Sequence, residues 1–185
     1  FILMNRVISK ILIVLCFLSV ASCAKQKQKD TTLDRFAAAQ SKKLVYGEVF
    51  DDADFLFSAT SYHVTLDDIA GLKQAWFEFA NTFPASHNIE TLEKEVGREG
   101  SMVFVVALYM TEYENANLKD KTKGWAVGPT PVLIKELDER DAPLRSLMPV
   151  KNDWARYYLV KYNRDFPVSS LTISNRIAKI ELKTQ

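Results

Sequence analysis

The sequence predicts a mainly β fold, a β-sandwich with one or two accessory helices, and three observations lead to this prediction. Residues 102–110 form a near-continuous apolar run of β-branched and aromatic residues, which is typical of a strand covered on both faces. Residues 154–162 alternate between two faces, as strands do. Clear helical spacing of apolar residues occurs in one stretch, 65–83. Apart from one shorter helix, the rest of the pattern is strand and turn.

The first half of the chain predicts two strands followed by two helices. Residues 44–50 and 54–64 read as strands. Thr65 and Asp68 then approximate a capping box, which marks a helix start. One side of that helix is predicted to carry its apolar residues into the core: Ile69, Leu72, Trp76, Phe79 and Phe83. The Phe83–Pro84 pair should end the helix, and Asn88 should cap a shorter one over 89–96 that ends at Gly97.

The second half predicts further strands. Residues 124–127 and 132–134 flank a Gly-Pro-Thr-Pro turn, and Pro143 excludes a long helix in the charged stretch 135–147. Residues 171–182 read as one terminal strand with a bulge near Asn175. This pattern of strands and helices is similar to that of immunoglobulin-like or transthyretin-like sandwiches.

Composition sets the broad class of the protein. The chain has 185 residues, a length that favours one folded domain. Its 24 Lys and Arg against 23 Asp and Glu give a net charge of +1. The chain therefore lacks the excess of basic residues that would indicate a nucleic-acid partner.

Residues 1–22 have the features of a secretory signal peptide. Counting from Met4 as the expected start, the segment carries Arg6 and Lys10 and no acidic residue. Residues 11–24 are uncharged, but they are fewer than the roughly 17 to 25 apolar residues that span a bilayer. A basic start, a short apolar core and small residues at the end define such a signal.

The last residues of this signal, Val20, Ala21, Ser22 and Cys23, resemble the lipobox of bacterial lipoproteins. The resemblance implies cleavage before Cys23, a diacylglyceryl group on its sulfur, and acylation such as palmitate on its amine. Two or more chains give a stable membrane anchor. Ordinary signal cleavage that leaves a free thiol is the alternative. Ala24 in place of Asp implies the outer membrane if the host is diderm.

Three segments follow from this interpretation: a signal peptide over 1–22, a lipidated tether over 23–34 and a single β-rich domain over 35–185. Cleavage removes two bases and no acid, so the net charge falls from +1 to −1. It also removes Cys16, and lipid occupies Cys23, the other cysteine of the chain. The folded domain is therefore expected to contain no free thiol.

Metal and cofactor chemistry has little support in the sequence, and no cofactor is expected. The two histidines, His63 and His87, lack the spacing of a zinc site. Asp51, Asp52 and Asp54 could supply calcium ligands, with Asp67 and Asp68 if the fold brings them near. A solvated turn is the alternative interpretation of this aspartate cluster.

Catalytic motifs are also missing. The chain has no Gly-x-Ser-x-Gly elbow. A hydrolase could still be assembled from Ser58 or Ser61 with His63 or His87, or from two carboxylates. The glutamates considered for such a pair are Glu48, Glu78, Glu95 and Glu112.

Four residues are candidates for a binding face, because Tyr, Trp and Arg dominate many interfaces: Tyr113, Trp125, Arg156 and Tyr158. The favoured hypothesis is a non-enzymatic envelope lipoprotein that binds a protein partner, as an accessory of a secretion or envelope assembly. Small lipoproteins with a transthyretin-like sandwich serve type VI secretion, and the predicted architecture resembles theirs in class. An envelope hydrolase and a carbohydrate or calcium-dependent adhesion module are the alternatives.

Overall fold

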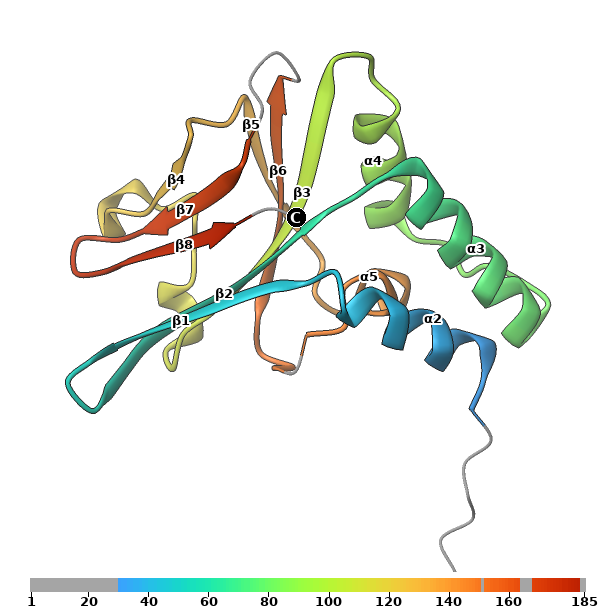
Figure 1. Ribbon diagram of the computed structural model, residues 1–185, viewed down its shortest axis with the longest axis horizontal. Helices are drawn as coiled ribbons and strands as arrows, with labels where there is room; N and C mark the ends of the chain where they lie inside the picture. The colour runs from blue at the N-terminus through green and yellow to red at the C-terminus, as the bar shows by residue number, and fades with distance from the viewer. Residues whose placement is uncertain (1–29, 151, 164–167, 184–185) are drawn as a thin grey trace, which may run out of the picture. The chain divides into compact units, whose positions relative to one another are not determined.

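The computed structural model describes residues 30–150, 152–163 and 168–183 (Figure 1). Residues Thr31–Gln185 form a compact unit of their own. The elements follow one another in the order α2 Thr32–Ser41, β1 Val45–Asp51, β2 Asp54–His63, α3 Leu66–Ala80, α4 His87–Val96, β3 Ser101–Tyr109, η1 Tyr113–Asn115, η2 Lys121–Lys123, β4 Ala126–Gly128, β5 Leu133–Leu137, α5 Ala142–Leu147, β6 Arg156–Asn163, β7 Ser170–Ser174 and β8 Lys179–Lys183.

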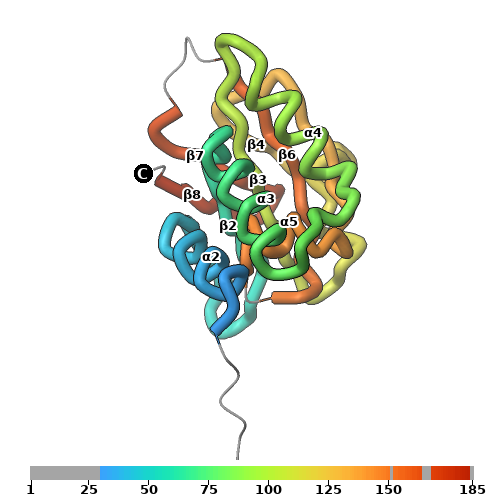
Figure 2. Tube along the Cα trace, turned by 90° about the vertical axis from the view of Figure 1, so that its right-hand side faces the viewer, coloured from blue at the N-terminus to red at the C-terminus, as the bar shows by residue number. Residues whose placement is uncertain are grey.

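The strands form two antiparallel sheets. The larger sheet has the order β1-β2-β3-β6-β5, and the smaller has the order β4-β7-β8. The four α-helices of the described chain gather on one side of the larger sheet, and the smaller sheet covers the opposite face (Figures 1 and 2). The predicted mainly β fold is confirmed in this form, but the helical layer is larger than the one or two helices expected.

Alternation along β3 and β6 divides the core between the two layers. Phe104, Val106 and Leu108 pack with β7 and β8, whereas Val103 and Val105 pack with the helices. Every one of these five side chains is at most 1% exposed. The prediction that 102–110 is covered on both faces is therefore confirmed. Residues of β6 alternate in the same way between the two clusters.

The helix predicted from Thr65 begins as expected but ends earlier. The Thr65 hydroxyl accepts from the Asp68 amide, and the Asp68 carboxylate accepts from the Thr65 amide. The helix ends at Ala80, because Asn81 adopts a left-handed conformation with φ 54°. The predicted core position of Phe79 is wrong: its side chain is 51% exposed.

The second helix, α4, also differs at its start. Ser86 is the N-cap, and its hydroxyl accepts from the Ile89 amide. Asn88, the predicted cap, instead joins α4 to the segment after β5: its side chain donates to the Asp138 carbonyl and accepts from the Asp138 amide.

Two other elements differ from the prediction. Residues 171–182 form a hairpin, β7 and β8, rather than one bulged strand. The Asn175 side chain accepts from the amides of Ile177 and Ala178, which closes the turn. Helix α2 was not predicted, and it begins at Thr32, inside the tether expected over 23–34. The two short strands beside the Gly-Pro-Thr-Pro turn exist, but β4 pairs with β7 and β5 pairs with β6.

Within the described residues, no helix is long and apolar enough to cross a membrane.

Candidate functional site

A cavity of about 580 Å³ lies on the helical side of the larger sheet, where the β1–β2 hairpin extends beyond the helices (Figure 1). Its lining comes from the start and middle of β1, from β2, from the end of β3, and from the segments on either side of these strands. The lining residues are Ser41, Leu44, Tyr46, Glu48, Ser58, Thr60, Ala107, Tyr109, Pro149, Val150, Asn152 and Ala155. This volume is in the range of small-ligand sites.

The alternation of β1 explains why the cavity has aromatic and polar walls. Val45, Gly47 and Val49 are half-buried, while Tyr46, Glu48 and Phe50 are exposed. Glu48 lies opposite Ser58 across the β1–β2 ladder. The exposed face of β1 therefore adds one ring and one carboxylate to the cavity, beside the hydroxyls of β2.

Tyr46 and Glu48 form the polar centre of the cavity. The Tyr46 hydroxyl donates to Glu48 Oε2 at 2.5 Å. Partial burial and this hydrogen bond raise the pKa of Tyr46, so the phenol stays protonated and donates to the carboxylate. Among the described residues that line the cavity, Glu48 alone carries a charge.

A row of aromatic rings continues from the cavity toward the hairpin tip. The Tyr109 ring lies 5.5 Å from the Phe55 ring, and Phe55 lies 5.7 Å from Phe50 in an edge-to-face contact. Phe50 is 51% exposed. The open part of the sheet thus presents aromatic rings beside an acidic group, an arrangement that favours ligands with an apolar body and a positive charge.

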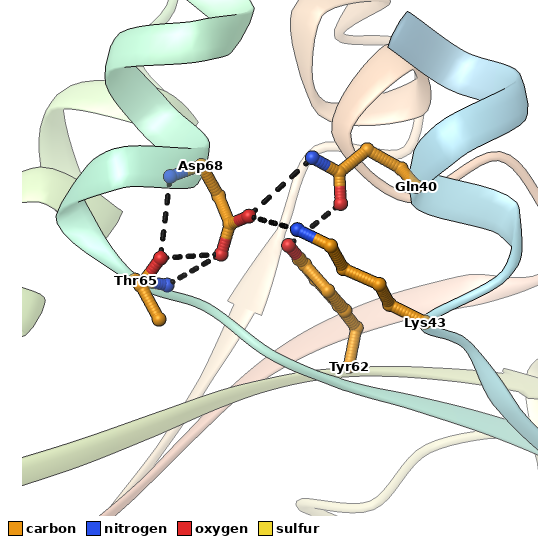
Figure 3. Close-up of polar contacts among 5 residues, drawn as sticks. All are labelled: Gln40, Lys43, Tyr62, Thr65 and Asp68. Carbon is orange, nitrogen blue, oxygen red and sulfur yellow. Dashed lines mark hydrogen bonds and ion pairs between the residues drawn. The ribbon is translucent and has the colours of Figure 1, made fainter. Parts of the chain in front are cut away.

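A second polar group, the Asp68 cluster, lies between α2, β2 and α3 and comprises Gln40, Lys43, Tyr62, Thr65 and Asp68 (Figure 3). Lys43 Nζ lies 2.8 Å from Asp68 Oδ1. The Tyr62 hydroxyl donates to Gln40 Oε1 at 2.7 Å, and Gln40 Nε2 donates to Asp68 Oδ1 at 3.4 Å. The cluster borders a smaller hollow of about 370 Å³.

The pKa shifts in the Asp68 cluster favour a structural role over acid–base catalysis. Burial opposes ionisation of Asp68, but hydrogen bonds from Lys43, Thr65 and Tyr62 outweigh it and lower its pKa to about 2. Burial and the nearby Asp68 raise the pKa of Tyr62. A general acid or base works best with a pKa near the working pH. Neither group meets that condition at neutral pH.

The structure brings the four predicted binding residues together around one turn, η1. Trp125 Nε1 donates to the Asn115 carbonyl at 2.8 Å, and the Tyr158 hydroxyl donates to the Ala116 carbonyl at 2.7 Å. The Arg156 guanidinium lies 5.2 Å from the centre of the Tyr113 ring. Trp125 is 7% and Tyr158 0% exposed. The polar atoms of these two residues therefore hold the turn from inside the protein.

Arg156 and Tyr113 are also engaged with neighbouring carboxylates. Arg156 donates to Glu136 Oε1 through Nε at 2.9 Å and through a second guanidinium nitrogen. The Tyr113 hydroxyl donates to Glu139 at 3.1 Å. Of the four, Tyr113 reaches a surface hollow, of about 440 Å³, which it shares with Arg140, Arg145, Asp153 and Trp154 among others.

The calcium candidates lie at the tip of the β1–β2 hairpin. Asp51, Asp52 and Asp54 are exposed, and Asp52 has a left-handed φ of 51°, which an aspartate in a turn tolerates. Asp67 and Asp68 follow the opposite end of β2. In the part of the chain that the structure describes, no group of three or more His, Cys, Asp or Glu could hold a metal ion.

The remaining candidates are spread over the fold. His63 ends β2 and His87 begins α4. The four glutamates considered for catalysis have different partners: Glu48 with Tyr46, Glu78 with Gln74, Glu95 with Lys161 and Glu112 with Asn115. Cys23 lies outside the described residues.

Sequence reasoning missed Tyr46 and Tyr109 and used Glu48 only as a catalytic candidate. The signal that could have found Tyr46 is the alternation in 45–50, which places Tyr46, Glu48 and Phe50 on one face. This face of β1 stays exposed because the β1–β2 hairpin extends beyond the helices (Figure 1).

In comparisons with known proteins, no protein-family model, curated protein or solved structure matches the chain. The function is therefore inferred from the site itself.

Proposed function

We propose that the chain is a lipid-anchored envelope lipoprotein whose β-rich domain is a non-enzymatic binding module. The open cavity beside β1 carries this proposal. It combines a volume of about 580 Å³ with two tyrosine rings and a single charged residue, Glu48, among its described lining. Sites of this kind bind a ligand by its apolar body and orient it through a few polar groups.

The ligand class follows from charge and ring chemistry. Tyrosine faces attract cations, and the exposed Glu48 carboxylate adds an opposite charge beside them. We therefore assign to the cavity an alkylammonium group, that is, an ammonium on an apolar stem. The lysine side chain of an envelope protein partner has this chemistry, and so does a small amine.

The anchor in this proposal rests on the residues Val20, Ala21, Ser22 and Cys23. The location, the outer membrane of a diderm host, rests on Ala24. The finer class of the sandwich, immunoglobulin-like or transthyretin-like, and the role as an accessory of a secretion or envelope assembly are parts of the same proposal. Antiparallel pairing in both sheets and their shared core support a sandwich of that general kind.

A matched ligand series tests the cavity. Hexylammonium, hexanol and hexanoate share one apolar chain and differ in head-group charge, and NMR titration measures their dissociation constants. We expect hexylammonium to bind about tenfold more tightly than hexanol, because about 1.4 kcal/mol of charge attraction corresponds to tenfold. Hexanoate should bind more weakly than hexanol.

Glu48→Gln should remove the preference for hexylammonium and leave hexanol binding unchanged. Glu90→Gln is the matched control, because Glu90 is an exposed carboxylate of α4 outside the lining, and this variant should behave as the parent protein. Equal binding of all three ligands, or a preference that survives Glu48→Gln, would contradict the assignment. A lysine-containing peptide and free hexylammonium then distinguish a protein partner from a small amine.

A further inference from the structure

Aromatic side chains are concentrated at the C-terminal end of α3 and just after it, two of them exposed and two half-buried against the helical core. Four lie within eight residues, and we call them the aromatic tip: Trp76, Phe77, Phe79 and Phe83. Phe77 is 61% exposed and Phe79 is 51% exposed. The Trp76 and Phe79 rings are in edge-to-face contact at 6.0 Å. Phe77 and Phe79 leave large apolar surface in contact with water at this end of the helical layer.

The aromatic tip lies at the same end of the domain as the start of α2. Near the other end of the two helices, Gln40 of α2 bonds to Asp68 of α3. One to two turns further along, the Phe36 ring contacts Gly71, and Thr32 and Glu78 line one surface hollow. The two helices are therefore antiparallel. Figures 1 and 2 both show the start of α2 beside the end of α3.

The length of the tether limits how far this end can be from a lipid on Cys23. Eight residue steps separate Cys23 from Thr31, where the described fold begins its first helix. A fully extended chain of that length spans at most about 26–29 Å. Lys25, Lys27 and Lys29 of the tether also favour an anionic bilayer surface. The chain therefore leaves the domain toward Cys23 at the end that bears the aromatic tip.

We propose that the aromatic tip inserts into the interface of the bilayer that holds the Cys23 lipid, and that it fixes the orientation of the domain on the membrane. Aromatic side chains concentrate at the level of the lipid headgroups. Each fully buried Phe strengthens partition by roughly tenfold to a hundredfold. This inference rests on the proposed lipid anchor, and the bilayer is its partner.

In the test, the mature chain, residues 23–185, is attached to a vesicle through Cys23. Chemical coupling replaces the natural lipidation. Cys23 is the single thiol of that chain, so it couples to a maleimide phospholipid in vesicles of phosphatidylethanolamine and phosphatidylglycerol at three to one. Lipids brominated on the acyl chain quench only tryptophans at the membrane. We expect quenching of Trp76, and we expect Phe77→Ser/Phe79→Ser to lower that quenching by at least about half.

Ile177→Ser is the matched control, because Ile177 is an exposed apolar side chain, at 74%, in the turn between β7 and β8. It should leave the quenching unchanged, and circular dichroism should show all variants folded. Absence of quenching in the parent chain overturns the proposal. Quenching that survives the double substitution also overturns it. A change in the sedimentation coefficient of the double variant in solution would do the same, because the aromatic tip would then be a protein interface.

Mass spectrometry of the peptide that contains Cys23, from protein purified from envelopes, tests the lipid anchor of the proposed function separately from the membrane insertion. An unmodified Cys23 would refute the anchor, whatever the vesicle experiment shows. Quenching absent from the tethered chain would refute the orientation, even with Cys23 lipidated.

Discussion

At the scale of single residues, Asp68 shows how one carboxylate can serve two parts of the fold. It accepts from the Thr65 amide at 2.9 Å, which closes the start of α3. It also pairs with Lys43 at 2.8 Å, which ties that helix to the segment between α2 and β1. A capping residue that is buried and ion-paired should contribute more than an exposed cap.

We predict that Asp68→Asn lowers the free energy of unfolding by about 2 kcal/mol at pH 7, because it removes the charge-assisted bond to Lys43. The folded pKa of Asp68 is lowered to about 2, below the unfolded value of about 3.9. The stabilisation is therefore present above about pH 4 and is lost as the pH falls toward 2. Urea unfolding between pH 2 and 7 measures both effects.

Asp67→Asn is the control for this prediction, since Asp67 is the exposed neighbour of Asp68 on the same helical turn. It should change stability by less than about 0.5 kcal/mol. An equal loss in both variants would show that general helix-dipole effects, rather than the Asp68 cluster, account for the result.

At the scale of elements, α4 is joined to β6 by a buried ion pair as well as by apolar contacts. Lys161 Nζ lies 2.9 Å from Glu95 Oε2, and the two side chains are only 11% and 10% exposed. Arg98 adds a second contact to the same oxygen at 3.1 Å. The alternation of β6 placed Lys161 on the face of Tyr157 and Leu159, but it could not show that a glutamate from α4 would meet it.

We predict that Lys161→Met and Glu95→Gln each destabilise the protein by about 3 kcal/mol, because each leaves a buried charge with an incomplete set of partners. Replacing both residues with Met should cost clearly less than the sum of the single losses. Chemical denaturation of the parent chain, both single variants and the double variant gives the coupling energy. Additive losses would mean that the pair does not join α4 to β6.

At the scale of the whole molecule, the two sheets meet closely where β1 passes β8. A Cβ atom added at Gly47 would lie 2.9 Å from Ile180 Cγ2 and 3.2 Å from Leu182 Cδ2. Both residues belong to the core between the sheets. Glycine at this position allows the hairpin to lie against the smaller sheet while its other face stays open at the cavity.

We predict that Gly47→Ala destabilises the protein by about 1–3 kcal/mol, because the new methyl group overpacks the junction of the two sheets. Ile180→Ala removes the closest methyl group. In the double variant the effect of Gly47→Ala should therefore shrink or vanish, and thermal unfolding of the four proteins measures this. A loss of the same size in both backgrounds would instead indicate a backbone effect confined to β1.

Local sequence determined much of this protein. The apolar run of 102–110 and the alternation in 154–162 predicted two core strands. The Thr65–Asp68 pair predicted the start of α3. These signals depend on near neighbours in the sequence. Helix α2 escaped prediction, since only two large apolar residues, Leu33 and Phe36, mark its apolar side beside three alanines. The break at Asn175 was predicted to be a bulge. It is a turn because the strands on its two sides pair with each other, and the sequence pattern does not show that pairing.

Tertiary structure alone decided which faces remain open. Periodicity marks a face as apolar or aromatic, but it carries no record of what packs there. Phe79 and Trp76 share one helical spacing, yet Phe79 is 51% exposed whereas Trp76 packs against the helical core. Tyr46 and Tyr109 became the walls of a cavity only because the hairpin outreaches the helices. Trp125 and Tyr158, with the same chemistry, were buried by the smaller sheet and the turn they hold.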